Sequence, residues 1–221
     1  MKKVITIGRE FGSGGREIGR RIAEKLQIAY YDQEIVTEIA KRTKLSEEYV
    51  ERITEDRPYM SYPIHVGTSF YMGYYAYTEI DRSLSVFAEQ HSIILELADR
   101  SDCVIVGRCA DYILKDNPDV ISVFCYSDVE ERIQWSIDEY QVPAKQAKKI
   151  VQEKDAQRSR FYEFYTNQKW GNPRNYTLMI NTSKMSTEET VQLLASFYDA
   201  KKGILTFKNA FENQYEKDNK Y

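Results

Sequence analysis

The chain has 221 residues, 42% of them hydrophobic and 29% charged, a composition typical of a soluble globular protein and a length that fits one full domain with a smaller inserted lobe. Lys and Arg number 31 against 34 Asp and Glu, so no global positive field favours nucleic acid as a partner. No segment approaches the run of about 20 apolar residues that a membrane helix needs, and the first apolar segment is too short for a signal peptide. Three cysteines, Cys103, Cys109 and Cys125, lie in or beside apolar runs. We therefore expect reduced, packed thiols and a cytoplasmic protein.

Short β-branched runs alternate with longer segments of helical period in the first half of the chain. In chain order, the patterns predict a strand over 4–7, a helix over 16–26, a strand over 29–31, a helix over 33–42, a helix opened by Ser46 and a long helix over 78–99. Residues 57–77 contain several prolines and glycines, a pattern that predicts no regular helix or strand there.

The alternation is clearer in the second half. We expect strands over 103–106, 120–125 and 177–180, and helices over 128–139, from Pro143 to about 164, and from 186 to about 200. Ser127 and Ser186 are each followed by a glutamate three residues later, which predicts a capping box at both helices. Five apolar strands separated by helices predict a parallel sheet covered on both faces. Ligands bind such sheets at the carboxyl ends of the strands. The segments expected to meet there are 8–16, 32, 107–111 and 181–183.

Glycines are concentrated between the first strand and the first helix. Five of the ten fall within residues 8–19. Unhindered backbone N–H groups and a helix N-terminus together form an anion site. A tight turn without a ligand is the alternative, but Arg9 and Arg16 lie nearby and favour phosphate. The predicted phosphate-binding residues are Gly12, Ser13, Gly14, Gly15, Arg16 and Glu17.

The loop departs from the standard phosphate-binding patterns. Glu17 stands where the dinucleotide fingerprint has its last glycine. The ATP-type pattern fits in placement, but Gly15 takes the lysine position. Arg16, or Glu17 in a loop one residue longer, takes the hydroxyl position. Because phosphoryl transfer needs a cation near the transferred group, Arg9 and Arg16 are the candidates to replace the lysine.

Four segments together resemble the cytidylate-kinase-like family of nucleoside monophosphate kinases, over roughly residues 4–200. They are Ile5-Thr-Ile-Gly-Arg-Glu-Phe-Gly-Ser-Gly-Gly-Arg-Glu-Ile-Gly19, Tyr30-Tyr-Asp32, Val104-Ile-Val-Gly-Arg-Cys-Ala-Asp-Tyr-Ile113 and Ile180-Asn-Thr-Ser183. The resemblance implies one α/β domain over 1–221 with the P-loop kinase fold, a five-stranded parallel sheet flanked by helices. The implied core covers about 1–45, 91–130 and 175–205, with a small helical acceptor-binding lobe at about 46–90 and a helical lid at about 131–174.

The resemblance also implies ATP, Mg²⁺ and a monophosphate acceptor. Tyr31-Asp32 matches the family's acceptor site, although Asp32 could instead cap the following helix. Arg108 follows a strand end and a glycine, where it can clamp a phosphate; a surface salt bridge is the alternative. Asp111, also assigned to the acceptor site, falls two residues later than the family's aspartate. Candidate oxygen ligands for Mg²⁺ are Ser13, Glu17 and Asp32.

The family's lid carries an Arg-Asp-x-x-Arg pattern that closes over phosphates. Lys154 stands in for the first arginine here, followed by Asp155 and Arg158. Arg132 and Arg160 lie on the same helical arm, which could also be an ordinary solvated surface. The residues predicted to act in phosphoryl transfer are Arg9, Arg16, Arg108, Arg158 and Arg160.

Three functional hypotheses follow. The first is an ATP-dependent kinase of a nucleoside monophosphate, CMP or dCMP foremost. The second, a kinase of another small metabolite, is motivated by six tyrosines within residues 59–77. These tyrosines could stack a base or sugar, or pack a lobe core or a homodimer surface. The third, a nucleotide-binding regulatory protein without turnover, is motivated by the missing lysine.

Overall fold

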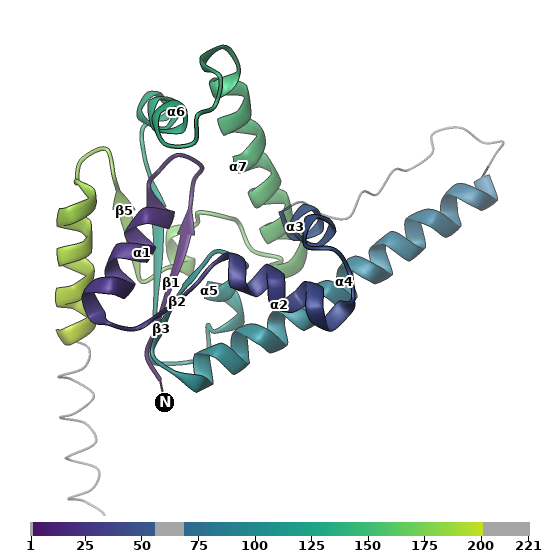
Figure 1. Ribbon diagram of the computed structural model, residues 1–221, viewed down its shortest axis with the longest axis horizontal. Coiled ribbons are helices and arrows are strands. Elements are labelled where there is room, and N and C mark those ends of the chain that lie inside the picture. The colour runs from purple at the N-terminus through teal and green to yellow at the C-terminus, as the bar shows by residue number, and fades with distance from the viewer. Residues whose placement is uncertain (1, 56–68, 201–221) are drawn as a thin grey trace, which may run out of the picture.

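A five-stranded parallel sheet forms the centre of the computed structural model, which describes residues 2–55 and 69–200 (Figure 1). Only the backbone is described for residues 55 and 69–80. The strand order is β2-β3-β1-β4-β5. The strands are β1 (Val4–Arg9), β2 (Ala29–Tyr31), β3 (Cys103–Val106), β4 (Val120–Tyr126) and β5 (Leu178–Asn181). The predicted parallel sheet is thus confirmed.

The helices connect and cover the strands. They are α1 (Gly15–Leu26), α2 (Gln33–Thr43), α3 (Glu47–Glu55), α4 (Ser69–Arg100), α5 (Ala110–Ile113), α6 (Val129–Asp138) and α7 (Ala144–Thr166), with a 3-10 turn at Pro173–Asn175 and a helix over 187–200. The prediction that α4 begins at residue 78 is wrong, because the backbone is already helical from Ser69. Both prolines and Gly67 of that region precede Ser69, so only Gly73 lies within the helix, where one glycine costs about 1 kcal/mol.

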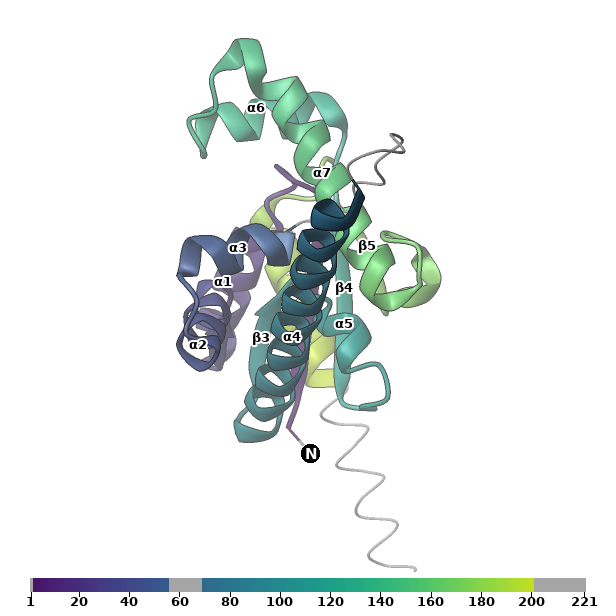
Figure 2. The same cartoon turned by 90° about the vertical axis from the view of Figure 1, so that its right-hand side faces the viewer.

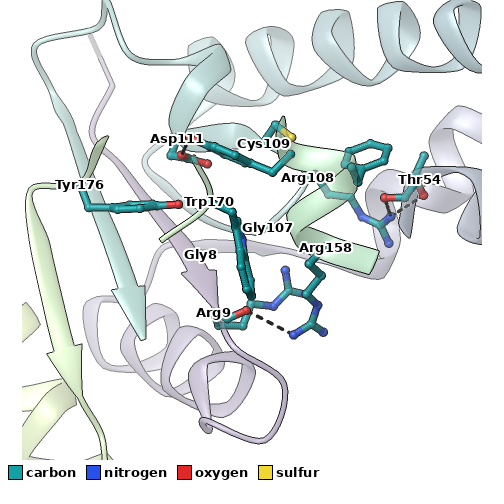
Figure 3. Close-up of a pocket in the computed structure, with 12 residues that line it drawn as sticks. Gly8, Arg9, Thr54, Gly107, Arg108, Cys109, Asp111, Arg158, Trp170 and Tyr176 are labelled. Atoms are coloured by element: carbon teal, nitrogen blue, oxygen red, sulfur yellow. Dashed lines mark hydrogen bonds between the residues drawn. The ribbon is translucent and has the colours of Figure 1, made fainter. Parts of the chain in front are cut away.

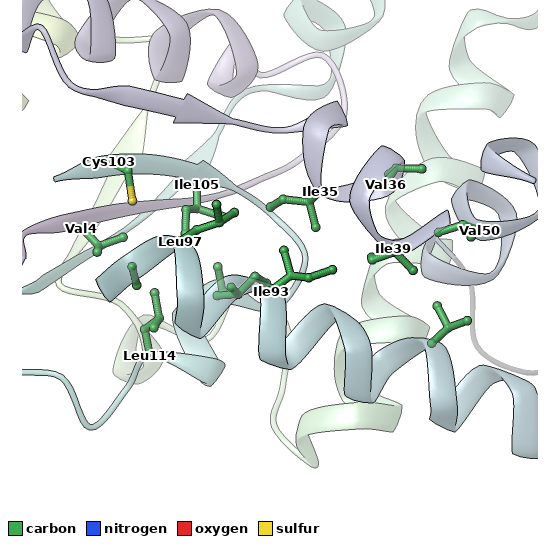
Figure 4. Close-up of a cluster of buried hydrophobic side chains, with 14 of the residues drawn as sticks. Val4, Ile35, Val36, Ile39, Val50, Ile93, Leu97, Cys103, Ile105 and Leu114 are labelled. Atoms are coloured by element: carbon green, nitrogen blue, oxygen red, sulfur yellow. The ribbon is translucent and has the colours of Figure 1, made fainter. Parts of the chain in front are cut away.

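Both faces of the sheet are buried, which explains why its strands are continuous apolar runs. On one face, Val4 and Ile105 pack with residues of α2 and α4, including Ile39 and Ile93 (Figure 4). On the other, strand residues pack with α1 and the helix over 187–200. Adjacent strand residues alternate between the two faces. Turned by 90°, the molecule shows α6 and α7 standing together at one end of the sheet (Figure 2).

The two expected capping boxes have different outcomes. At Ser186, the hydroxyl accepts the Glu189 N–H at 3.3 Å and the Glu189 carboxylate accepts the Ser186 N–H at 2.8 Å, which confirms the box. The box predicted at Ser127 is wrong, because α6 begins after Asp128 without a side-chain cap. The Ser127 hydroxyl instead bonds to the Ser183 hydroxyl at 2.8 Å. A contact between the ends of β4 and β5 therefore replaces the local cap.

The three cysteines are buried and unpaired, as the sequence predicts. Burial raises the pKa of Cys103 and of Cys125 to about 12, so both remain thiols near neutral pH. Within the described part of the chain, no helix combines the length and apolar character needed to cross a bilayer.

Candidate active site

The glycine loop joins β1 to the first turn of α1 at the carboxyl edge of the sheet. Gly12 and Gly14 have φ of 80° and 72°, values that favour glycine. A side chain at Gly12 would also collide with the Arg132 carbonyl oxygen of α6. The Ser13 hydroxyl donates to the Glu10 carbonyl oxygen at 2.9 Å. The loop is therefore a compact turn that leads into a helix N-terminus, a geometry that suits an anion.

Arg16 and Asp32, predicted for the two different phosphate sites, contact each other. Arg16 Nε lies 2.6 Å from Asp32 Oδ2, and this carboxylate raises the pKa of Arg16. The Tyr30 hydroxyl lies 3.5 Å from the same carboxylate. Asp32 occupies the N-cap position of α2, but its side chain makes no cap hydrogen bond. The geometry thus favours its pairing with α1 over the capping alternative.

A cleft opens where β1 and β3 end, next to the glycine loop (Figure 3). Helices α3, α5 and α7 and the segment before β5 complete its walls. Four predicted site residues come together in it: Arg9, Arg108, Asp111 and Arg158. The sheet edge therefore gathers side chains from positions separated by up to about 150 residues, as parallel strands allow.

Arg9 and Arg158 meet at the mouth of this cleft. Arg158 Nη1 donates to the Arg9 carbonyl oxygen at 3.3 Å, and both guanidinium groups lie close together (Figure 3). The Arg9 guanidinium lies against Gly107, which has φ of 72°. Any side chain at Gly107 would occupy the space of Arg9, so the glycine admits the arginine to the cleft.

The backbone after β3 is held in an uncommon shape that places Arg108. Arg108 and Cys109 both have positive φ, 57° and 54°, at a cost of about 1–2 kcal/mol each. The buried Gln90 side chain donates to the Arg108 carbonyl oxygen at 2.9 Å and supports this turn. The Arg108 guanidinium reaches α3, where it donates to the Thr54 hydroxyl.

An acid and aromatic rings line the inner part of the cleft. The Tyr162 hydroxyl donates to Asp111 Oδ2 at 2.7 Å. Burial raises the pKa of Asp111 to about 6 and, together with the Asp111 charge, raises the pKa of Tyr162. Trp170 and Tyr176 pack around Phe124, with ring centroids 5.2 and 4.9 Å from it.

Several of these residues were not predicted from the sequence. Thr54, Gln90, Tyr162, Trp170 and Tyr176 lie in helices or loops whose patterns carry no functional signal, and only tertiary contacts bring them to the cleft. The tyrosine cluster at 59–77, for which ligand contact or packing was expected, lies outside the side chains that the structure describes.

The predicted lid residues divide between different environments. Arg132 is buried and pairs with Asp155 beside the glycine loop. Arg158 lines the cleft. Lys154 is half-buried, Arg160 is exposed, and neither lines the cleft. Arg158 and Arg160 differ because positions 158 and 160 point to different sides of α7.

The predicted magnesium ligands do not share one site. Glu17 pairs with Arg20 and Arg21 on α1, at 2.7 and 2.6 Å. Ser13 bonds to Glu10, and Asp32 to Arg16. Among the described residues, no three His, Cys, Asp or Glu side chains are grouped to hold a metal ion.

A second hollow borders a later part of the glycine loop than the first cleft does. Gly12, Ser13 and Gly14 form one wall, and Trp135 and Thr182 are among the others. The Thr182 hydroxyl donates to the Ser13 carbonyl oxygen at 3.0 Å, which ties the segment after β5 to the loop. The glycine loop therefore contributes to the lining of two cavities, Gly8 and Arg9 to the first and Gly12, Ser13 and Gly14 to the second.

Comparison with known proteins agrees with this architecture. A model of the cytidylate kinase-like family matches residues 4–184, and the chain belongs to that family. It is 24% identical over 201 residues to a cytidylate kinase of Methanopyrus kandleri, covering 89% of this chain and 93% of the relative. The family and the fold are those of phosphotransferases.

Solved structures show the same fold. An uncharacterized protein from Eubacterium ventriosum superposes with a TM-score of 0.67 and 26% identity, covering 90% of this chain and 99% of that one. A shikimate kinase from Bacteroides thetaiotaomicron superposes with a TM-score of 0.51 and 13% identity, covering 89% of this chain and 98% of that one. A gluconokinase from Sinorhizobium meliloti superposes with a TM-score of 0.51 and 14% identity, covering 93% of this chain and 97% of that one. The P-loop kinase fold is thus shared by kinases that differ in their substrates.

Proposed function

We propose that the protein transfers the terminal phosphoryl group of ATP to a nucleoside monophosphate, CMP or dCMP foremost, and releases ADP and the diphosphate. The observation that carries the proposal is the convergence of Arg9, Arg108 and Arg158 in a cleft beside the glycine loop. Phosphoryl transfer requires two phosphate sites held side by side, with cations around the transferred group.

The two cavities suit the two substrates. The N–H groups of the glycine loop and of the α1 N-terminus would bind the ATP phosphates, with the nucleoside in the hollow beside Trp135. Arg108 and Arg158 would hold the acceptor phosphate, because guanidinium groups bind phosphate oxygens through two parallel hydrogen bonds. Arg9 at the end of β1 and Arg16 in the first turn of α1 would supply the charge of the missing lysine.

The transfer itself needs no covalent enzyme intermediate. An oxygen of the acceptor phosphate attacks the γ-phosphorus in line, and the bond from that phosphorus to the β–γ bridging oxygen breaks. The arginines spread the negative charge that develops. Mg²⁺ normally accompanies ATP, but the predicted ligands Ser13, Glu17 and Asp32 do not assemble into one site, so no step here depends on them.

The division into lobes is part of the proposal. Residues 131–174 would form the lid, which is supported by α7 carrying Arg158 into the cleft. Residues 46–90 would form the acceptor lobe, which is supported by the contact of Thr54 in α3 with Arg108.

A kinase of another small metabolite is the second candidate. The observation in its favour is the buried Asp111–Tyr162 pair, which can accept from and donate to a substrate hydroxyl. Such a pair would suit a hydroxylated acid or sugar as well as a nucleotide.

An acceptor panel distinguishes these functions. The protein is mixed with ATP, Mg²⁺ and single nucleoside monophosphates or small hydroxylated metabolites, and ADP is measured. We expect ADP with CMP or dCMP, and its loss in Arg108→Ala. Arg42→Ala is the control, since Arg42 pairs with Glu96 at the surface between α2 and α4. ADP only with a metabolite would favour the second candidate, and ATP binding without ADP formation would favour a regulatory protein.

A further inference from the structure

Two side chains one turn apart on α7 hold the backbone of the glycine loop. Asp155 Oδ1 accepts the Phe11 N–H at 2.7 Å. Arg158 Nη1 donates to the Arg9 carbonyl oxygen at 3.3 Å, and its guanidinium lies over the Phe11 ring, 5.5 Å from the centroid. Residues three apart share one side of a helix. This turn of α7 therefore contacts the loop backbone at both a donor and an acceptor.

Arg132 of α6 completes the contact. Its buried guanidinium pairs with Asp155 and donates to the Phe11 carbonyl oxygen at 3.3 Å. Its Nε donates to the Ser127 carbonyl oxygen at 3.1 Å and lies 3.3 Å from Glu10 Oε2. Both backbone polar groups of Phe11 are thus bonded to one arginine–aspartate pair.

Burying such a cluster of charges costs free energy. Removing charges from water costs several kcal/mol per ion, and a buried pair often recovers no more than that. The cost is visible at Glu10, whose pKa is raised by burial. Next to the cluster, Gly12 leaves room for the Arg132 backbone. What the cluster fixes is the path of the loop.

We propose that Asp155 and Arg132 are positioning residues that hold the lysine-less glycine loop in the conformation that binds nucleotide phosphates. The proposal rests on the proposed binding of a nucleotide at this loop. Because Arg158 belongs to the same turn of α7 and lines the acceptor cleft, the helix also fixes the loop and the cleft relative to each other.

Three variants of the full chain separate positioning from packing. Asp155→Ala removes the acceptor for Phe11 N–H and one of the two carboxylate partners of Arg132. Asp155→Asn keeps an oxygen acceptor but removes the charge, and it remains informative if the alanine variant does not fold. Glu153→Gln is the matched control, because Glu153 is an exposed carboxylate of α7 that faces Lys149 at 3.6 Å.

The probes are ADP and inorganic pyrophosphate, each with Mg²⁺, titrated calorimetrically, together with amide hydrogen exchange at Phe11 and thermal unfolding. We expect Asp155→Ala to weaken both probes about tenfold, as losing a charge-assisted hydrogen bond does, and to abolish protection of the Phe11 amide. Asp155→Asn should weaken them less, and Glu153→Gln should change affinity by less than about twofold. A purely structural role would lower the melting temperature without changing affinity.

Unchanged affinity in Asp155→Ala would overturn the proposal. Tighter binding in that variant would also overturn it, because the carboxylate would then compete with phosphate for the Phe11 N–H. Failure of the wild-type protein to bind either probe would overturn it as well. Neither probe is an acceptor, so a protein that binds both but phosphorylates nothing would contradict the proposed function alone.

Discussion

The glycine loop and the neighbouring cleft both contain arginines but use them differently. At the loop, Arg132 pairs with Asp155 and Glu10, so its charge is neutralised by carboxylates of the protein. In the cleft, Arg108 donates to the Thr54 hydroxyl and Arg158 to the Arg9 carbonyl oxygen, so uncharged oxygens help to orient both guanidinium groups. Charge pairs hold the shape of the loop, whereas hydrogen bonds to uncharged oxygens and, after β3, unusual backbone angles help to place the arginines of the cleft.

The largest expected effect is on kcat/KM, from a substitution that disturbs the cleft and leaves the loop intact. Gly107→Ala would place a methyl group in the space of the Arg9 guanidinium. We expect kcat/KM to fall about a hundredfold or more, because small displacements of catalytic groups cost that much. The matched control is Gly171→Ala, which has a similar φ of 69° but only ordinary contact with Phe124 at 3.4 Å. Equal losses in both variants would attribute the effect to backbone strain instead.

The next effect concerns the inner cleft and depends on pH. Burial raises the folded-state pKa of Asp111 to about 6 from 3.8, so the folded protein binds this proton more tightly than the unfolded chain. The stabilisation it contributes is complete below about pH 4 and is lost as pH rises through 6, a change of about 3 kcal/mol. Urea unfolding between pH 4 and 7 should show this loss in the wild type and not in Asp111→Asn. Parallel pH profiles for the two proteins would contradict it.

A third comparison concerns the loop alone. Gly12→Ala and Gly14→Ala impose similar strain, since both residues have positive φ. Only a side chain at Gly12 would collide with backbone, that of Arg132, whereas a side chain at Gly14 would meet Trp135 at an ordinary 3.6 Å. We expect Gly12→Ala to lower the free energy of unfolding by about 2 kcal/mol more than Gly14→Ala does. Equal losses would show that α6 yields to a side chain at Gly12.

The smallest expected change in stability belongs to Arg16. Its side chain is 56% exposed, and exposed ion pairs contribute about 1 kcal/mol or less. Arg16→Ala should therefore unfold at nearly the same urea concentration as the wild type. If Arg16 replaces the missing lysine, kcat should still fall at least about tenfold. Unchanged kcat would leave Arg9 as the candidate for that role.

The central part of the fold follows from short-range patterns in the sequence. Apolar β-branched runs such as Val4–Ile7 specify buried strands, and the glycines after them specify a loop that bulkier residues cannot form. The rule that parallel strands end at one edge then brings Arg9 and Arg108 together. Where local patterns compete with tertiary contacts, they mislead, as at Ser127, whose hydroxyl bonds across to Ser183.

The sequence by itself determined the sheet, the glycine loop and the family to which the chain belongs, because each is encoded by neighbouring residues. Only the tertiary structure decided which partners the charged side chains of the loop and the cleft contact. Asp155 reaches the Phe11 N–H across 144 positions of the chain, and Thr54 meets Arg108 across 54. No local spacing encodes such contacts, because they depend on how helices pack against the sheet edge.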